Sequence, residues 1–241
     1  MSRPLVVAHR GHSARFPENT VVAYRGAIAA GADLVETDAR LTADGIPVAV
    51  HDADLVRVAG TQATVAGTAC ADLKAMARAR GVEVPTLEEA LSAICPARDA
   101  LIDVKTADLA IIDAIVAVLR RLDVTDRVWL GVRDAGQAAH ARGHLPTVRV
   151  LAFLPDGEDP QRFADAGAAA FRIWEGALDG PAAGHLFASR PVWVTTGGKG
   201  TGRKVGDVGA SELRGILARG PGAVLLNDPD LMVGLTGTKA S

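Results

Sequence analysis

Two histidines near the start of the chain each stand directly after a short apolar run. His9 follows the letters LVVA, and His51 follows the letters PVAV. Between them, Glu36 and Asp38 lie two positions apart in a largely apolar stretch. Successive side chains of a strand point to opposite faces, so these two carboxylates are expected to share one face. Histidine titrates near neutral pH and carboxylates bind cations, so this set could carry metal-assisted acid–base chemistry.

A third acidic residue, Asp103, interrupts another apolar stretch farther along the chain. A buried carboxylate is costly unless it is paired or binds a cation. Taken alone, Asp38 could form a structural ion pair with Arg40, and such pairs also perturb pKa values. Asp103 could do the same with Lys105. Together with Glu36, these residues make three acids at the ends of neighbouring strands, and such a group favours a metal site instead. An all-oxygen ligand set suits Mg2+ or Ca2+ better than zinc.

Positive charge stands next to these candidate residues. Arg10 follows His9, and Lys105 lies shortly after Asp103. Beside a metal, both cations would favour an anionic, oxygen-rich group such as phosphate, although ion pairing is their purely structural alternative. A single histidine at a strand end is more often a packed residue than a catalyst, but two beside an acidic cluster favour catalysis. One would then accept a proton while the other donates one.

Short apolar runs alternate with helix-like segments along the chain. After a turn at Asp44-Gly45, the segment Pro47–Val50 is expected to return as an extra short strand that delivers His51 into a long connection. Thr86 and Glu89 have the spacing of a capping box at the start of a helix. Helices are expected at Val21–Ala30, from Thr86 to about Ile94 and at Leu109–Leu122, and the eight principal strands at Leu5–Ala8, Asp33–Ala39, Leu101–Lys105, Val128–Val132, Val148–Phe153, Ala169–Trp174, Val192–Thr195 and Ala223–Leu226.

This alternation predicts an α/β fold with a parallel sheet. Eight strand–helix units in 241 residues fit a (β/α)8 barrel of the TIM type. An open doubly wound sheet is the alternative, but no Gly-x-Gly-x-x-Gly follows the first strand, and the candidate residues stand at the carboxyl ends of strands, where barrel enzymes keep their sites. We therefore expect residues 1–241 to form a single barrel domain, with a short β-hairpin or loop insertion after the second strand.

The composition is typical of a folded protein that acts on a small molecule. Hydrophobic residues make up 49% of the chain, and the net charge is -2 with 26 basic and 28 acidic residues. The sequence contains no stripe of basic residues interleaved with aromatic residues, so nucleic-acid binding is not expected. The longest apolar tract, Leu109–Leu119, is too short to cross a bilayer, so no membrane insertion is expected. No secretory signal pattern precedes the first strand, which favours a cytoplasmic location, and Cys70 and Cys95 are expected to be packed thiols.

The order of the motifs resembles that of the glycerophosphodiester phosphodiesterase family. The resemblance is dense over residues 6–105 and weaker beyond them. Any one motif would be weak evidence, whereas the ordered set is highly specific. The set comprises His9-Arg10-Gly11, Pro17-Glu18-Asn19-Thr20, Glu36-Thr37-Asp38, Asp44-Gly45-Ile46-Pro47-Val48, His51-Asp52 and Pro85-Thr86-Leu87-Glu88-Glu89.

This resemblance implies a TIM-type barrel that binds a divalent cation, commonly Ca2+ or Mg2+. It also implies hydrolysis of glycerophosphodiesters to glycerol 3-phosphate and an alcohol. We favour His9 as the base that activates the attacking oxygen, of water or of a neighbouring substrate hydroxyl, and His51 as the acid that protonates the leaving alkoxide. By motif position, the metal ligands correspond to Glu36, Asp38 and Asp103, the acid–base pair to His9 and His51, and the phosphate-binding group to Arg10, Lys105 and the nearby Asn19.

The chain departs from the family pattern at several places. Asp103 stands where the family often has the longer Glu, and Asn227 replaces the first Asp of a closing Thr-Asp-Arg-Pro-Asp phrase, which concerns substrate choice more than reaction type. After Val192-Trp193 comes a Gly-rich basic loop, 197–204, without the spacing of a nucleotide-binding P-loop. This loop is expected to be a mobile lid or a flexible surface loop, and the second interpretation is favoured.

Three other functions fit part of this pattern. A lysophospholipase D-like phosphodiesterase of the same superfamily would need an apolar mouth. A non-catalytic barrel that binds phosphodiesters would not need the complete set of histidines and carboxylates. A metal-dependent sugar-phosphate isomerase or lyase would share the fold and the carboxylates but would not require the ordered motifs.

Overall fold

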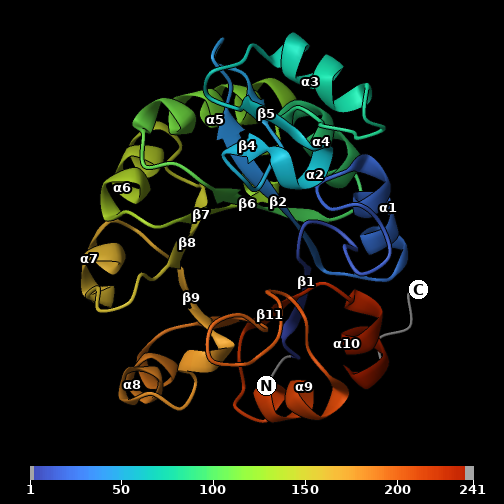
Figure 1. Cartoon of the computed structure of the whole chain (residues 1–241). Helices are drawn as coiled ribbons and strands as arrows, with labels where there is room; N and C mark the ends of the chain where they lie inside the picture. The colour runs from blue at the N-terminus through green and yellow to red at the C-terminus, as the bar shows by residue number, and fades with distance from the viewer. Residues whose placement is uncertain (1–2, 237–241) are drawn as a thin grey trace.

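The computed structural model describes residues 3–236, in which eight parallel strands form a closed ring surrounded by helices (Figure 1). The ring closes because β11 pairs with β1, which in turn pairs with β2. The predicted (β/α)8 barrel is therefore confirmed. In order around the ring, the strands are β1 (Leu5–Ala8), β2 (Leu34–Leu41), β6 (Asp99–Val104), β7 (Val128–Val132), β8 (Arg149–Phe153), β9 (Ala170–Trp174), β10 (Val192–Thr195) and β11 (Ala223–Leu226).

Helices cover the outside of the ring, and several of them begin at residues whose side chains cap them. The capping box predicted for α4 is confirmed, since the Thr86 hydroxyl accepts from the Glu89 amide and the Glu89 carboxylate accepts from the Thr86 amide. Thr20 caps α1, and Asp108 caps α5. The outer helices are α1 (Val21–Ala29), α4 (Leu87–Ile94), α5 (Leu109–Leu122), α6 (Ala135–His144), α7 (Pro160–Asp165), α8 (Pro181–Ser189), α9 (Ala210–Leu217) and α10 (Pro229–Thr236), with 3-10 turns η1 (Thr125–Arg127) and η2 (Glu175–Ala177).

The connection after β2 is more structured than the hairpin or loop that the sequence predicted. The extra strand is present but ends at Val48, and it pairs antiparallel with β2. The residues beyond it pack around a small core of their own that includes Leu55 and Leu73, both fully buried. Four of these five elements span only two to four residues, too few for a clear hydrophobic period, whereas the fifth, α3, spans nine. They are β3 (Pro47–Val48), β4 (Asp54–Leu55), α2 (Val56–Ala59), β5 (Thr61–Thr64) and α3 (Cys70–Arg78).

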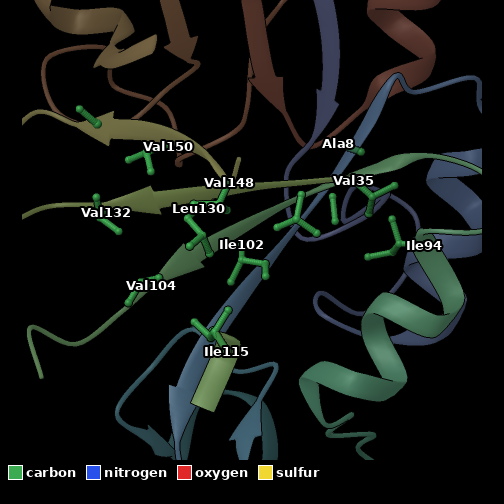
Figure 2. Close-up of a cluster of buried hydrophobic side chains, with 14 of the residues drawn as sticks. Ala8, Val35, Ile94, Ile102, Val104, Ile115, Leu130, Val132, Val148 and Val150 are labelled. Atoms are coloured by element: carbon green, nitrogen blue, oxygen red, sulfur yellow. The ribbon is translucent and has the colours of Figure 1, made fainter. Parts of the chain in front are cut away.

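Outward-facing strand residues and the helices form the main hydrophobic core. Figure 2 shows part of it, where Val35 of β2 lies near Ile94 of α4 and Ile102 of β6 lies near Ile115 of α5. Each fully buried aliphatic side chain of this kind stabilises the fold by about 1.5–3 kcal/mol. The core thus fixes which face of each strand points outward.

Inward-facing residues alternate with those of the outer core and fill the barrel. Val7, Leu34 and Leu101 belong to this inner cluster, and the next inward positions along the same strands are polar. The polar side chains therefore gather at the carboxyl ends of the strands, as predicted for a barrel enzyme.

Two other sequence predictions concern the cysteines and the membrane. Cys70 and Cys95 are both free and buried, as expected of packed thiols. Within residues 3–236, no helix combines the length and the apolar character that crossing a membrane requires.

Candidate active site

Three carboxylates meet inside the barrel at the carboxyl ends of two neighbouring strands. Glu36 and Asp38 come from β2 and Asp103 from β6, and one oxygen of each lies within 4.8 Å of the others. The strand register explains the meeting, since Asp38 stands directly beside Asp103. Their exposed fractions are 1%, 0% and 5%. The structure thus brings together the three acids that the sequence singled out as metal ligands.

Three cations surround these carboxylates. The Lys105 Nζ atom lies 2.9 Å from an Asp38 oxygen and also pairs with Asp103. Two guanidinium nitrogens of Arg133 donate hydrogen bonds to the Asp103 carboxylate, one of them over 2.9 Å. The Arg10 Nε atom lies 3.3 Å from Asp38. Lys105 and Arg10, the predicted phosphate-binding residues, are therefore at the site, where Arg10 also pairs with Glu18 at 2.9 Å.

The turn after β1 holds Arg10 against the carboxylates. Arg10 adopts a left-handed backbone conformation with φ of 56°, and its amide donates to a Glu36 oxygen over 2.6 Å. Gly11 follows with φ of 77°, where a Cβ atom would lie 2.6 Å from the backbone of Ala23 in α1. Only glycine allows this close approach of the turn to the helix.

Asn19, in the loop before α1, is hydrogen-bonded to Asp38, one of the candidate metal ligands. Its side-chain nitrogen donates to the Asp38 carboxylate over 2.6 Å, and its oxygen accepts from the Asp38 amide over 3.1 Å. Asn19 is 3% exposed and also has a left-handed backbone, with φ of 56°. Its closeness to the site agrees with the sequence prediction, and its contacts are with a carboxylate that it orients.

The carboxylate cluster has the chemistry of a site for a hard cation. The Glu36 Oε1 atom is buried and has no hydrogen-bond partner in the described part of the chain. Burial and the neighbouring Asp38 and Asp103 carboxylates raise the pKa of Glu36 well above its usual value. An oxygen-only ligand set fits Mg2+ or Ca2+, and such an ion would satisfy Oε1 and remove the cost of ionising Glu36.

His9 is held by an amide whose orientation is fixed. The Asn227 nitrogen donates to the Val205 carbonyl and to Asp207, over 2.9 and 2.8 Å, so the Asn227 oxygen must face the imidazole. This oxygen lies 2.8 Å from His9 Nδ1, which therefore carries the proton and donates it. The Nε2 atom is left with a free lone pair.

The environment keeps the His9 ring neutral. Burial is the largest cause, the Arg10 charge adds to it, and together they lower the pKa of His9 to about 4. The imidazole is 7% exposed. A neutral ring with an available Nε2 atom can accept a proton at neutral pH.

His51 has a different environment at the edge of the same site. Its Nδ1 atom lies 2.7 Å from Asp52, and Arg57 of α2 holds the other Asp52 oxygen at 2.6 Å. Burial lowers the pKa of His51, whereas the Asp38 and Asp52 carboxylates act in the opposite direction. Arg40, the alternative partner considered for Asp38, instead donates to the His51 carbonyl over 2.8 Å.

The Gly-rich loop 197–204 is anchored to the turn after β9. The Gly197 amide donates to Glu175 over 2.7 Å, and Arg203 forms an ion pair with the same carboxylate. Gly198 and Arg203 also form an antiparallel bridge across the loop. These contacts define a closed turn, not a long free segment.

Sequence reasoning missed two residues that complete the site. Arg133 follows the apolar strand β7, so the rule that selected His9 could also have selected it. Asn227 was noted only as a departure from a motif, and its contact with His9 joins two ends of the chain that are 218 positions apart. Only the closure of the ring brings those ends together.

Comparison with known proteins finds a matching family model and related sequences. The model of the Glycerophosphoryl diester phosphodiesterase family matches residues 9–142. The probable glycerophosphodiester phosphodiesterase 2 of Mycobacterium tuberculosis is 34% identical over 128 residues, which are 53% of this chain and 47% of that protein. The chain spans about half the length of the first curated relatives that it matches.

Solved structures share the fold along nearly the whole chain. The Oleispira antarctica phosphodiesterase in complex with the product sn-glycerol-3-phosphate has a TM-score of 0.83 at 22% identity, with 98% of each chain covered. The glycerophosphodiester phosphodiesterase of Thermotoga maritima has a TM-score of 0.80 at 20% identity, covering 98% of this chain and 99% of that one. At these identities, the structures establish the common barrel.

Proposed function

The chain belongs to the glycerophosphoryl diester phosphodiesterase family, and we propose that it hydrolyses glycerophosphodiesters to glycerol 3-phosphate and an alcohol with the help of a divalent cation. One observation carries the proposal: a buried carboxylate cluster, with a Glu36 oxygen that has no hydrogen-bond partner among residues 3–236, stands beside a neutral histidine whose Nε2 atom bears a lone pair. This combination would supply a cation site and a base at the same end of the barrel.

The cation would be held by the carboxylates that the sequence selected. Glu36, Asp38 and Asp103 are the proposed ligands of Mg2+ or Ca2+. When bound, the ion supplies positive charge that offsets the negative charge of the phosphate oxygens in the transition state. Lys105, Arg10 and Arg133 would add positive charge beside the ion, which suits an anionic diester.

His9 and His51 would move the protons. His9 Nε2 takes the proton of the attacking oxygen, which belongs to water or to a neighbouring hydroxyl of the glycerol, while that oxygen bonds to phosphorus. The bond from phosphorus to the leaving oxygen breaks, and His51 gives its proton to that oxygen. When the attacker is the glycerol hydroxyl, this step forms a cyclic phosphodiester. Water then opens the ring to glycerol 3-phosphate, with His51 taking the proton of the water and His9 returning its proton to the glycerol oxygen. The Asp52 carboxylate stabilises the imidazolium form of His51 from the other side of the ring.

Arg10 and Lys105 would bind the scissile phosphate. Both already lie against Asp38, with closest contacts of 3.3 and 2.9 Å, so their charges are fixed at the edge of the cation site. A guanidinium and an ammonium in this position can contact phosphate oxygens without leaving the carboxylates unpaired.

The test is the release of glycerol 3-phosphate from glycerophosphocholine and its headgroup relatives. The purified chain is assayed after EDTA treatment and after re-addition of Mg2+ or Ca2+. We expect release only with the cation. His9→Ala and His51→Ala should bind the cation as the wild type does but lose turnover. Absence of cation-dependent release from every diester would overturn the proposal, and turnover retained by both variants would overturn the histidine roles.

One feature favours a lysophospholipase D-like specificity as a second candidate. An apolar cavity of about 330 Å3 lies at the carboxyl ends of β8 and β9, lined by residues that include Leu154, Ile173 and Trp174. A cavity of this size can take part of an acyl chain. Faster headgroup release from lysophosphatidylcholine than from glycerophosphocholine would support this candidate, and the reverse would contradict it.

A further inference from the structure

Arg172 is a buried cation inside the barrel that the proposed mechanism does not use. It lies on β9, where its neighbour Phe171 packs into the outer core while Arg172 points inward. The side chain is only 3% exposed. Burying a charge is costly unless the charge has partners, so the contacts of this guanidinium are informative.

Aromatic rings hold the Arg172 guanidinium in place. Its carbon Cζ lies 4.4 Å from the centre of the Phe153 ring and 4.1 Å from that of Trp174. Phe153 can lie across the barrel interior because β7 has Gly131 beside it, where a Cβ atom would come within 2.7 Å of the ring. Such contacts favour a cation and restrict its rotamers, but they leave its hydrogen-bond donors unused.

Two of the three guanidinium nitrogens of Arg172 have no hydrogen-bond partner among residues 3–236. Its Nε and Nη1 atoms are buried without a partner, and none of the ion pairs found among residues 3–236 includes it. Asp103 and Glu36 act on it only at longer range, and Asp103 is already held by Arg133. Asp156, 83% exposed in its side chain and 3.6 Å from Lys199, is a third carboxylate whose charge acts on it, and the Arg133 charge repels it.

The position of Arg172 separates it from the proposed cation site. β9 lies across the ring from β2, with β6, β7 and β8 between them on one side and β10, β11 and β1 on the other. Arg10 and Lys105 stand against the β2 carboxylates and would hold the scissile phosphate there. A substrate that spans the barrel would bring another of its groups to Arg172.

We propose that Arg172 forms a second anion-binding subsite, which takes a carboxylate or phosphate carried by the leaving alcohol of the diester. A planar guanidinium with unused donors matches the two oxygens of such a group and repels a trimethylammonium headgroup. That the substrate is a glycerophosphodiester rests on the proposed function. That it carries a second negative charge is inferred from Arg172 alone.

A matched pair of substrates isolates that charge. One is the glycerol 3-phosphate diester of 3-hydroxypropionate, and the other is the diester of propane-1,3-diol, which has the same length without the acid. Wild type should favour the acidic diester in kcat/KM. Arg172→Gln should lower kcat/KM for it by about 10- to 100-fold, the range for one charge-assisted hydrogen-bonded contact, and change the neutral diester by less than about threefold. Arg172→Lys should restore part of the preference.

Arg149→Gln is the control variant. Arg149 also stacks on an aromatic ring, 5.0 Å from the centre of Trp129, but it stands at the start of β8, away from the site. This substitution should leave the preference unchanged. Equal loss on both diesters in Arg172→Gln, or no preference in the wild type, would overturn the subsite.

A binding measurement separates this inference from the proposed function. Calorimetric titration of His9→Ala with the two diesters, with and without Arg172→Gln, requires no turnover. We expect the acidic diester to bind at least about tenfold tighter, and the difference to vanish in the double variant. If this difference in binding is found but the wild type hydrolyses neither diester, the proposed function is refuted and the subsite is retained. Hydrolysis of both diesters with no such difference in binding would refute the subsite alone.

Discussion

Aspartate in place of Asn227 should make His9 a stronger base. The Asn227 oxygen lies 2.8 Å from His9 Nδ1, while burial and Arg10 hold the pKa of His9 at about 4. A carboxylate in direct contact raises the pKa of a histidine by about 1–3 units, or about 1.4–4 kcal/mol in favour of the imidazolium form. The pKa of His9 should therefore move to between about 5 and 7.

The contacts of Asn227 require a second change alongside the first. Its side-chain nitrogen donates to Asp207 over 2.8 Å, so Asn227→Asp alone would set two carboxylates against each other. Adding Asp207→Asn restores a donor between the two positions. Asp207→Asn by itself is the control, because it keeps the amide oxygen that faces His9.

The assay is the pH profile of kcat/KM at a saturating concentration of the cation. A general base must be unprotonated, so the rate falls as the pH drops through the pKa of His9. Relative to the control, the double variant should lose activity at a pH about 1–3 units higher. Protonation of the carboxylate ligands affects both proteins and cancels in the ratio of their rates. A folded double variant with an unchanged acid limb would refute His9 as the base.

Further predictions concern the carboxylate cluster, the second histidine and the packing inside the barrel. Burial raises the pKa of Glu36, so at any pH above the ordinary glutamate pKa its ionisation destabilises the metal-free fold. Glu36→Gln should therefore raise the unfolding free energy in EDTA at pH 8 by about 1–3 kcal/mol. It should also abolish stabilisation by Mg2+ or Ca2+, and thermal melts would show both effects. Asp52→Asn should lower the pKa of His51, so the basic limb of kcat/KM should move to lower pH; an unmoved limb would contradict His51 as the acid. Gly131→Ala should destabilise the barrel by about 1–3 kcal/mol in denaturant unfolding, because the new methyl group would clash with an aromatic ring, whereas Gly143→Ala in a helix with open space should not destabilise it.

The sequence was most informative where local pattern determines position. Glu36 and Asp38 share a face because the strand period is two, and parallel strands put Asp103 at the same end of the barrel. Those residues could be selected before the fold was known. The (β/α)8 architecture followed from the same regular alternation of strands and helices.

What the sequence could not supply depends on contacts between distant segments. The tautomer of His9 is set by Asn227, at the far end of the chain, and the second partner of Asp103 is Arg133, directly after the next strand. The insertion that carries His51 was predicted only as a short β-hairpin or loop, because four of its five elements span two to four residues. Short elements are stabilised by their tertiary contacts more than by their own pattern.

The identity of the products tests the central claim most directly. Glycerophosphocholine is incubated with the purified chain and Mg2+ or Ca2+, and the phosphorus-containing product is identified by 31P NMR. Cleavage between phosphorus and the leaving alcohol predicts glycerol 3-phosphate and choline in equal amounts, with no product in EDTA or from His9→Ala. Phosphocholine and glycerol, or a product that forms equally well in EDTA, would contradict the account.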